Sequence, residues 1–147
     1  STLFPYTTLF RSVKLLGRDG GILPQLLKPV RYCAGRLGSG EQPLPWVHLD
    51  DVVAAIRFLA TQTHNGFQPY NITAPKRTTQ LDFARAAAKR LRRPLLFSVP
   101  EQALRLMLGE QADLVLDGQF APPQALVRQG FQFAFPTIER ALDNLLD

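Results

Sequence analysis

Short apolar runs alternate with amphipathic stretches along this chain of 147 residues, and that alternation restricts the folds it can form. The runs at 13–16, 46–49 and 69–73 have the length and composition of strands. Between the first two, the leucines and the valine of 23–30 recur at the spacing of a helix face. Glycine and proline separate these segments and signal turns, with Gly35, Gly38 and Gly40 forming one flexible region. The sequence therefore predicts an α/β fold.

A helix is predicted to begin at Asp50 or Asp51, and Asn65 and Gly66 predict a turn after it. A carboxylate at a helix start accepts hydrogen bonds from the free N–H groups of the first turn and interacts favourably with the dipole. Adjacent helical residues point about 100° apart, so we expect one aspartate to cap the helix and the other to face solvent. The predicted buried stripe consists of Val52, Val53, Ile56, Leu59 and Ala60.

The next helix is predicted from Thr79 and Asp82, which have the spacing of a capping box. A strand is expected over 95–99, and Ser98 with Glu101 predicts a further capped helix. The buried stripe of the helix that begins at Thr79 is expected to contain Leu81, Ala84, Ala88 and Leu91.

The C-terminal part is predicted to contain two more helices. One covers 124–129 and is closed by Gly130 as a left-handed residue. The other begins at Thr137. Between them Phe131, Phe133 and Phe135 alternate, which predicts a short strand with one aromatic face. The last helix is expected to bury Ile138, Ala141, Leu142 and Leu145.

Positive charge is concentrated in the segment 76–93, which contains a single acid, Asp82, in a chain of net charge +5. Its basic residues are Lys76, Arg77, Arg85, Lys89, Arg90, Arg92 and Arg93. The spacing of Arg85, Lys89 and Arg92 is that of the solvated face of a half-buried helix. The segment has neither interleaved aromatic residues for base stacking nor a known DNA-binding signature, which argues against nucleic acid. A free-standing basic module that contacts nucleic acid or another polyanion through 76–93 is the alternative function.

The single cysteine, Cys33, excludes an internal disulfide and a multi-cysteine metal site. One unpaired thiol is typical of a reducing compartment, so a cytoplasmic location is expected, with Cys33 as a packing residue. No apolar stretch approaches the ~18 residues that a membrane span requires. We therefore expect no membrane contact.

The first twelve residues, STLFPYTTLFRS, show no periodicity that continues into the rest of the chain. They lack the basic start, apolar centre and small-residue cleavage site of a signal peptide. The string LFPYTTLFRS resembles translated sequencing-adapter sequence. We therefore interpret 1–12 as a foreign or disordered arm and the chain as a truncated product, with a natural mobile arm as the alternative.

Several sequence runs, taken in order, carry a family resemblance. They are LGRDGG at 16–21, LGSGEQPLPWVHLDDVVAAI at 37–56 and YNITAP at 70–75, followed by LDFARAAAKRLRRP, VPEQALRLMLGE, GQFAPPQAL and GFQFAFP. Together they resemble the C-terminal half of NAD-dependent epimerase/dehydratase-like proteins, the epimerase-like branch of the atypical extended short-chain dehydrogenases/reductases. The resemblance implies a partial Rossmann-like sheet of late strands over 13–75. It also implies a small, mostly helical substrate-side domain over 76–147.

The resemblance further implies a parent protein in which a dinucleotide-binding N-terminal half precedes these residues. That parent would be an oxidoreductase that uses NAD(P) and a small-molecule substrate, with sugar nucleotides as one option. The chain has no glycine-rich turn between a strand and a helix that would hold a pyrophosphate. Its tyrosines are followed four positions later by Phe10, Arg36 and Ala74, so Tyr-x-x-x-Lys is absent. We therefore expect no catalytic, cofactor-binding or metal-binding residue, no bound cofactor and no turnover from this chain alone.

By the same resemblance, four residues are the candidates for lining the substrate cleft: Arg18, Gln42, Trp46 and His48. Arg18 would pair with a phosphate-bearing ligand as a bidentate donor, and a solvated turn formed by Arg18 and Asp19 is the alternative. For His48 the alternative is a structural histidine whose nitrogens are both hydrogen-bonded. Trp46 is expected to be core or cleft wall, because a large aromatic side chain packs whatever its function.

Strands that belong inside a parallel sheet are normally buried on both faces. Without their neighbours, 13–16 and 69–73 would leave unpaired edges and exposed apolar faces. Marginal stability or self-association of the isolated chain is therefore predicted.

Overall fold

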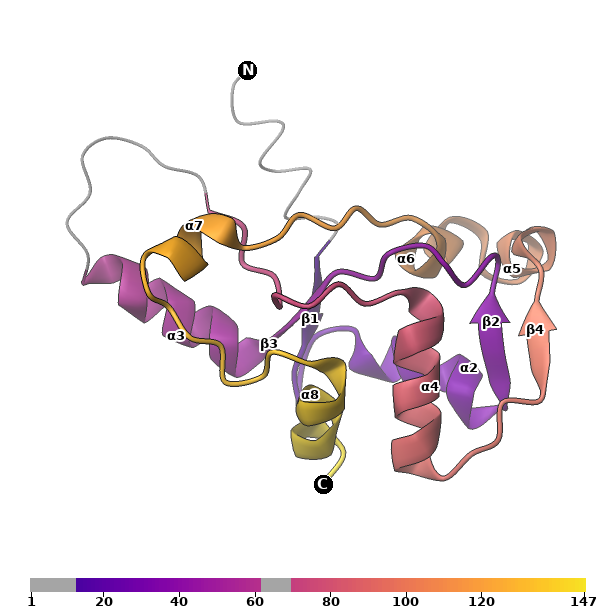
Figure 1. Ribbon diagram of the computed structural model, residues 1–147. Coiled ribbons are helices and arrows are strands. Elements are labelled where there is room, and N and C mark those ends of the chain that lie inside the picture. Colours follow the sequence, from indigo (N-terminus) through magenta and orange to yellow (C-terminus); the bar gives the residue numbers. More distant parts are fainter. Residues whose placement is uncertain (1–12, 62–69) are drawn as a thin grey trace, which may run out of the picture.

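The computed structural model describes residues 13–61 and 70–147. The predictions for 1–12, for the turn at Asn65 and Gly66, and for Pro69 lie outside these residues. Figure 1 shows α3 and α7 at one end of the molecule, β2, β4 and α5 at the other, and β1, β3 and α8 between them. In order, the elements are β1 (Lys14–Leu16), α2 (Leu23–Arg31), β2 (Ala34–Leu37), β3 (Trp46–His48), α3 (Leu49–Ala60), α4 (Gln80–Leu91), β4 (Phe97–Val99), α5 (Glu101–Leu108), the 3₁₀ helix η1 (Gly109–Ala112), α6 (Asp113–Leu116), α7 (Gln124–Arg128) and α8 (Ile138–Leu145).

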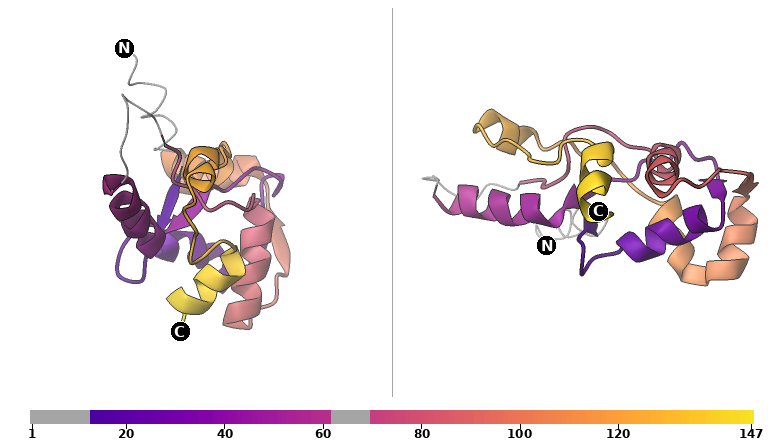
Figure 2. Two further views of the ribbon diagram at one scale, coloured as in Figure 1. Left: turned by 60° about the vertical axis from the view of Figure 1, so that its left-hand side comes forward. Right: turned by 90° about the horizontal axis from the view of Figure 1, so that it is seen from below.

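The described strands form two parallel pairs, and the fold is α/β as predicted. β1 pairs with β3, with Lys14 opposite Trp46 and Leu16 opposite His48. β2 pairs with β4 at the end of the molecule opposite α3 and α7, as Figure 1 and the right-hand view of Figure 2 show. The strands predicted over 13–16, 46–49 and 95–99 are thus confirmed with narrower bounds.

Three local predictions are wrong. Gly35 lies within β2, so only Gly38 and Gly40 form the turn, both with positive φ. Residues 70–73 run beside β3, with a backbone bond from Ala74 N to Trp46 O of 2.8 Å, but they form no strand. Residues 131–135 form no strand, although the three phenylalanines are less exposed than Gln132 and Ala134 between them. The backbone N–H groups of Ala134 and Phe135 donate to a side chain of α3 instead of to a neighbouring strand.

Helices with strong local start signals form as predicted. Thr79 and Asp82 make the capping box of α4, in which each side chain bonds to the other residue's backbone N–H at 3.1 Å. Thr137 caps α8, whose four predicted core residues are all buried. The Ser98 cap is wrong, because Ser98 lies in β4 and Pro100 precedes α5 without a side-chain cap.

The main hydrophobic core joins α2, α4 and α8 to the inner faces of β1 and β2. Its members include Leu16, Leu27, Ala84 and Leu142, which come from both sides of residue 75. A second cluster, at the α3 end, gathers Ala55, Leu126 and Phe131. The proposed boundary between 13–75 and 76–147 therefore crosses one shared core.

Helix α3 is apolar on two faces, and one of them is exposed. Asp51 and Ala55 face inward, whereas Leu49, Val53 and Ile56 are 38%, 41% and 56% exposed. These three residues lie four and three positions apart, on one side of the helix. The predicted buried stripe of this helix is therefore wrong in part, because its members Val53 and Ile56 lie on the exposed face. Among the described residues, no helix combines the length and apolar character needed to cross a membrane.

Candidate functional site

A cavity of about 430 Å³ opens where β1 and β3 end. The two strands are parallel, so the loops that follow them leave from the same edge of the pair. Ligands in open α/β sheets bind outside the carboxyl ends of strands, which makes this edge the first place to look for a site. The lining residues are Gly17, Arg18, Asp19, Gly20, His48, Leu49, Asp50, Asn144 and Leu145.

His48 lines this cavity and is 3% exposed. Its Nδ1 accepts a hydrogen bond from the backbone N–H of Asp50 at 3.0 Å, which makes it the N-cap of α3. Because Nδ1 is the acceptor, the ring proton lies on Nε2. Nε2 donates to Oδ1 of Asn144, and the two atoms are 2.9 Å apart. The ring also stacks on Phe135, with the centroids 3.9 Å apart. Both nitrogens are engaged, so His48 positions the loop and has no nitrogen left to act as a base.

Arg18 lines the same cavity and is exposed. One guanidinium nitrogen, Nη2, donates to the backbone carbonyl of Asn144. A guanidinium carries five N–H donors, so most of its hydrogen-bonding capacity faces the cavity or solvent. The structure therefore brings Arg18 and His48 to the same cavity.

Gln42 and Trp46, the other two candidates, have structural partners away from this cavity. Nε2 of Gln42 donates to the carbonyls of Leu37 and Val115, at 3.0 and 2.8 Å. Trp46 is 1% exposed, and its Nε1 donates to Oγ1 of Thr78 at 3.1 Å. These contacts support the packing alternative for Trp46.

Asp51 is the residue that the sequence analysis missed. It was expected to cap α3 or to face solvent, but it is 1% exposed and does neither. Its two carboxylate oxygens accept from the backbone N–H groups of Ala134 and Phe135, at 2.9 and 3.0 Å. Asp51 thereby holds the loop that carries Phe135 against His48. The solvated aspartate is Asp50, whose side chain is 72% exposed.

Lys14, in β1, is a buried lysine, with 5% of the residue exposed. Burial lowers the pKa of Lys14, and the negative charge of Asp117 partly offsets that effect. Among the residues that the structure describes, no group of three His, Cys, Asp or Glu side chains has the arrangement of a metal site.

The basic segment 76–93 is divided between α4 and the loop before it. Arg90 is paired with Asp143 and Asp147 at 3.4 and 3.2 Å, so it belongs to the contact between α4 and the C-terminal end. Lys76, Arg77, Arg85 and Lys89 instead surround a second cavity. Arg85, Lys89 and Arg92, which were expected to form a solvated face, are all exposed.

Residues 99–145 match the family described as "Domain of unknown function (DUF1731)". Over 133 residues the chain is 35% identical to the epimerase family protein MW0731 of Staphylococcus aureus, and this match covers 90% of the chain and 44% of the relative. It is 32% identical over 137 residues to the epimerase family protein SDR39U1 of Mus musculus, covering 92% of the chain and 47% of that protein. The chain thus spans a little under half the length of these relatives.

Two solved structures are similar to this fold. The human epimerase family protein SDR39U1 (isoform 2), solved with NADPH, aligns with a TM-score of 0.78 at 29% identity over 90% of this chain and 46% of its own. The nucleoside-diphosphate sugar epimerase of Corynebacterium glutamicum aligns with a TM-score of 0.66 at 23% identity over 91% of this chain and 25% of its own. The second likeness concerns the fold alone.

Proposed function

We propose that this chain, a relative of the epimerase family proteins over nine-tenths of its length, works as the C-terminal portion of such a protein. In that role it supplies the substrate-side surface, and a dinucleotide-binding half supplies the cofactor site. The observation that carries the proposal is the alignment with the NADPH-bound human structure, in which 90% of this chain superposes on 46% of that one. NADPH is accordingly the cofactor we assign to the assembled protein, and the cytoplasm is its expected location.

The exposed face of α3 is the surface we assign to contact with the dinucleotide-binding half. Leu49, Val53 and Ile56 form an apolar stripe that the described part of the chain leaves 38% to 56% exposed. Burying apolar surface contributes about 25 cal/mol per Å², so such a stripe favours association with a partner surface. Leu15, on the outer face of β1, is also 36% exposed. The predicted self-association of the isolated chain has the same origin.

Within the assembled protein, Arg18 is the residue we assign to substrate binding. Its guanidinium lies at the edge of the parallel strands and keeps donors for a phosphate or carboxylate group. His48 and Asp51 fix the shape of the cavity wall from behind. A small molecule with an anionic group is the substrate class that this arrangement favours. The reaction itself depends on residues outside this chain.

Reconstitution tests the proposal. The part of the Staphylococcus aureus relative that precedes the matching segment is co-expressed with this chain, and NADPH fluorescence is measured on the purified mixture. We expect a complex that binds NADPH and enhances nicotinamide fluorescence, whereas the 147-residue chain alone gives no change. Ile56→Glu is expected to prevent assembly, because it places a charge in the apolar stripe. The matched control is Ala54→Glu, which adds the same charge at an exposed position off that stripe.

Two outcomes would contradict the proposal. One is that the two folded parts do not associate. The other is that Ile56→Glu and Ala54→Glu behave alike. Arg18→Gln serves to test the site separately, since it is expected to leave assembly and NADPH fluorescence unchanged while weakening the binding of phosphorylated sugars at least about tenfold.

A further inference from the structure

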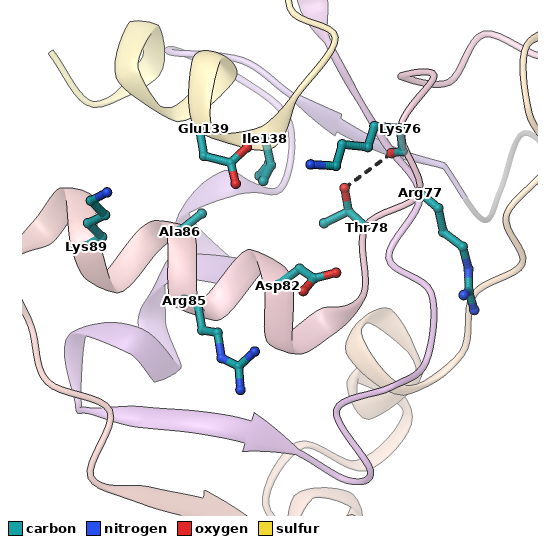
Figure 3. Close-up of a pocket in the computed structure, with 9 residues that line it drawn as sticks. All are labelled: Lys76, Arg77, Thr78, Asp82, Arg85, Ala86, Lys89, Ile138 and Glu139. Atoms are coloured by element: carbon teal, nitrogen blue, oxygen red, sulfur yellow. Dashed lines mark hydrogen bonds between the residues drawn. The ribbon is translucent and has the colours of Figure 1, made fainter.

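A second cavity, of about 390 Å³, lies between α4, the first turn of α8 and the loop before α4. It is distinct from the cavity at the ends of β1 and β3, with which it shares no lining residue. Figure 3 shows Lys76 extending toward Ile138 and Glu139 at the start of α8, while Arg77 and Arg85 extend outward on the side away from α8 and Lys89 lies further along α4. The proposed function uses none of these residues.

The charge around this cavity is mainly positive. Four cationic side chains and two acidic ones, Asp82 and Glu139, line it, which leaves an excess of two positive charges. Asp82 is already engaged, because its carboxylate accepts from the backbone N–H of Thr79 at 3.1 Å. None of the four cations has an ion-pair partner among the residues that the structure describes, in contrast to Arg90 and Arg105.

Two helices add to this field, because α4 and α8 both begin at the cavity. The positive ends of their dipoles favour an anion there. The cations stand on the rim and do not meet at one point, as Figure 3 shows, so a ligand with several charged groups satisfies them better than a single small anion.

The residues that line the cavity also indicate which ligands it does not favour. Ala86 and Ile138 are the apolar members, and none of the described residues that line the cavity is aromatic. Bases of single-stranded nucleic acids bind largely by stacking on aromatic side chains, which this cavity does not offer. The volume, in contrast, lies in the range of small-molecule pockets.

We propose that this cavity binds a compact polyphosphate group, on an inorganic or organic carrier, through Lys76, Arg77, Arg85 and Lys89. Recognition is through the phosphate oxygens, each of which accepts strong, charge-assisted hydrogen bonds from ammonium and guanidinium groups. The proposal is independent of the proposed function, because it concerns residues that lie away from α3 and from Arg18.

Calorimetric titration of the 147-residue chain with sodium tripolyphosphate, at low and at physiological salt, tests the inference. Arg85→Gln combined with Lys89→Gln is expected to weaken binding at least about tenfold. Arg57→Gln combined with Arg128→Gln removes the same charge at exposed sites elsewhere and is expected to change binding less than about twofold. Glu139→Gln is expected to tighten binding about two- to fivefold, because it removes a negative charge from the cavity.

Backbone NMR shifts of the unmodified chain provide a measurement that does not depend on how the variants fold. Tripolyphosphate is expected to shift the amides of 76–89 and of the first turn of α8. A nucleoside triphosphate is expected to bind within about threefold of tripolyphosphate, because the phosphate chain is the recognised part. Three results would each overturn the proposal. They are an equal loss of tripolyphosphate affinity in the two double variants, amide shifts centred on Arg18, and tighter binding of an octathymidylate than of tripolyphosphate.

Discussion

Replacing Asp51 by Asn is the sharpest test of how the candidate site is held together. The side chain keeps its shape, but one oxygen becomes an NH₂ group that faces a backbone N–H donor. The structure gives that carboxylate two acceptor contacts, at 2.9 and 3.0 Å, on a residue that is 1% exposed. A hydrogen bond to a charged group contributes about 1.5–3 kcal/mol. Losing one such bond and setting two donors against each other should therefore cost about 2–4 kcal/mol of unfolding free energy.

Asp50→Asn is the matched control for this change. It makes the same substitution one residue earlier, on a side chain that is 72% exposed. Both aspartates lie in the first turn of α3 and interact with the helix dipole, which contributes about 0.3–1 kcal/mol. The difference in unfolding free energy between the two variants therefore measures the contribution of the contacts to the backbone of 134–135.

Urea unfolding followed by the fluorescence of Trp46, the single tryptophan, measures both variants. Native-state hydrogen exchange adds a local readout, because the amides of Ala134 and Phe135 should exchange faster in Asp51→Asn and not in Asp50→Asn. Equal unfolding free energies for the two variants, with unchanged exchange rates at these amides, would show that Asp51 does not hold the loop at 134–135. The stacking of Phe135 on His48 would then need another cause.

Two further substitutions test the strand ends and the buried amine. Gly21→Ala should destabilise the fold by more than about 2 kcal/mol, because Gly21 has φ +79° and an added Cβ would lie 2.1 Å from the carbonyl oxygen of Leu15. The control is Gly20→Ala, because the space around Gly20 is open. Equal melting temperatures for the two variants would contradict this reasoning. Lys14→Met should stabilise the fold by about 1 kcal/mol, because it removes a buried ammonium group whose pKa is lowered by desolvation. The folded state binds this proton less tightly than the unfolded state, so the unmodified chain should gain stability as pH rises toward 10.5, and the advantage of Lys14→Met in urea unfolding should shrink over the same range. An advantage independent of pH would argue that the amine is not desolvated.

Local signals in the sequence were sufficient to predict those helices and strands whose ends they mark. Thr79 and Asp82 predicted the start of α4, since a capping box involves only residues three positions apart. The alternating strand and helix patterns likewise predicted β1, β3 and the α/β class. Arg18 and His48 were placed in one cleft by the family resemblance, and the parallel pairing of β1 with β3 is what brings them together.

The role of Asp51 could not be predicted, because its partners lie 83 and 84 residues away in sequence. Asp50 and Asp51 are the same residue type in the same turn, and only tertiary packing decides which is buried. The same limit applies to α3 as a whole. It carries apolar residues on two faces, and the helical period alone does not say which face meets the core and which, like that of Val53 and Ile56, stays outside.

The geometry of His48 bears on how chemistry would be shared in the assembled protein. A general base needs a nitrogen lone pair within reach of a substrate proton. In His48 the Nδ1 lone pair accepts from Asp50, and Nε2 carries the proton that faces Asn144. Freeing either nitrogen would uncap α3 or break the contact with α8. Proton transfer by His48 is therefore tied to loss of structure, and the cavity offers a ligand the donors of Arg18 instead. We therefore propose that the cleft residues of the described chain supply binding and shape, and that the reacting groups belong to the proposed dinucleotide-binding half.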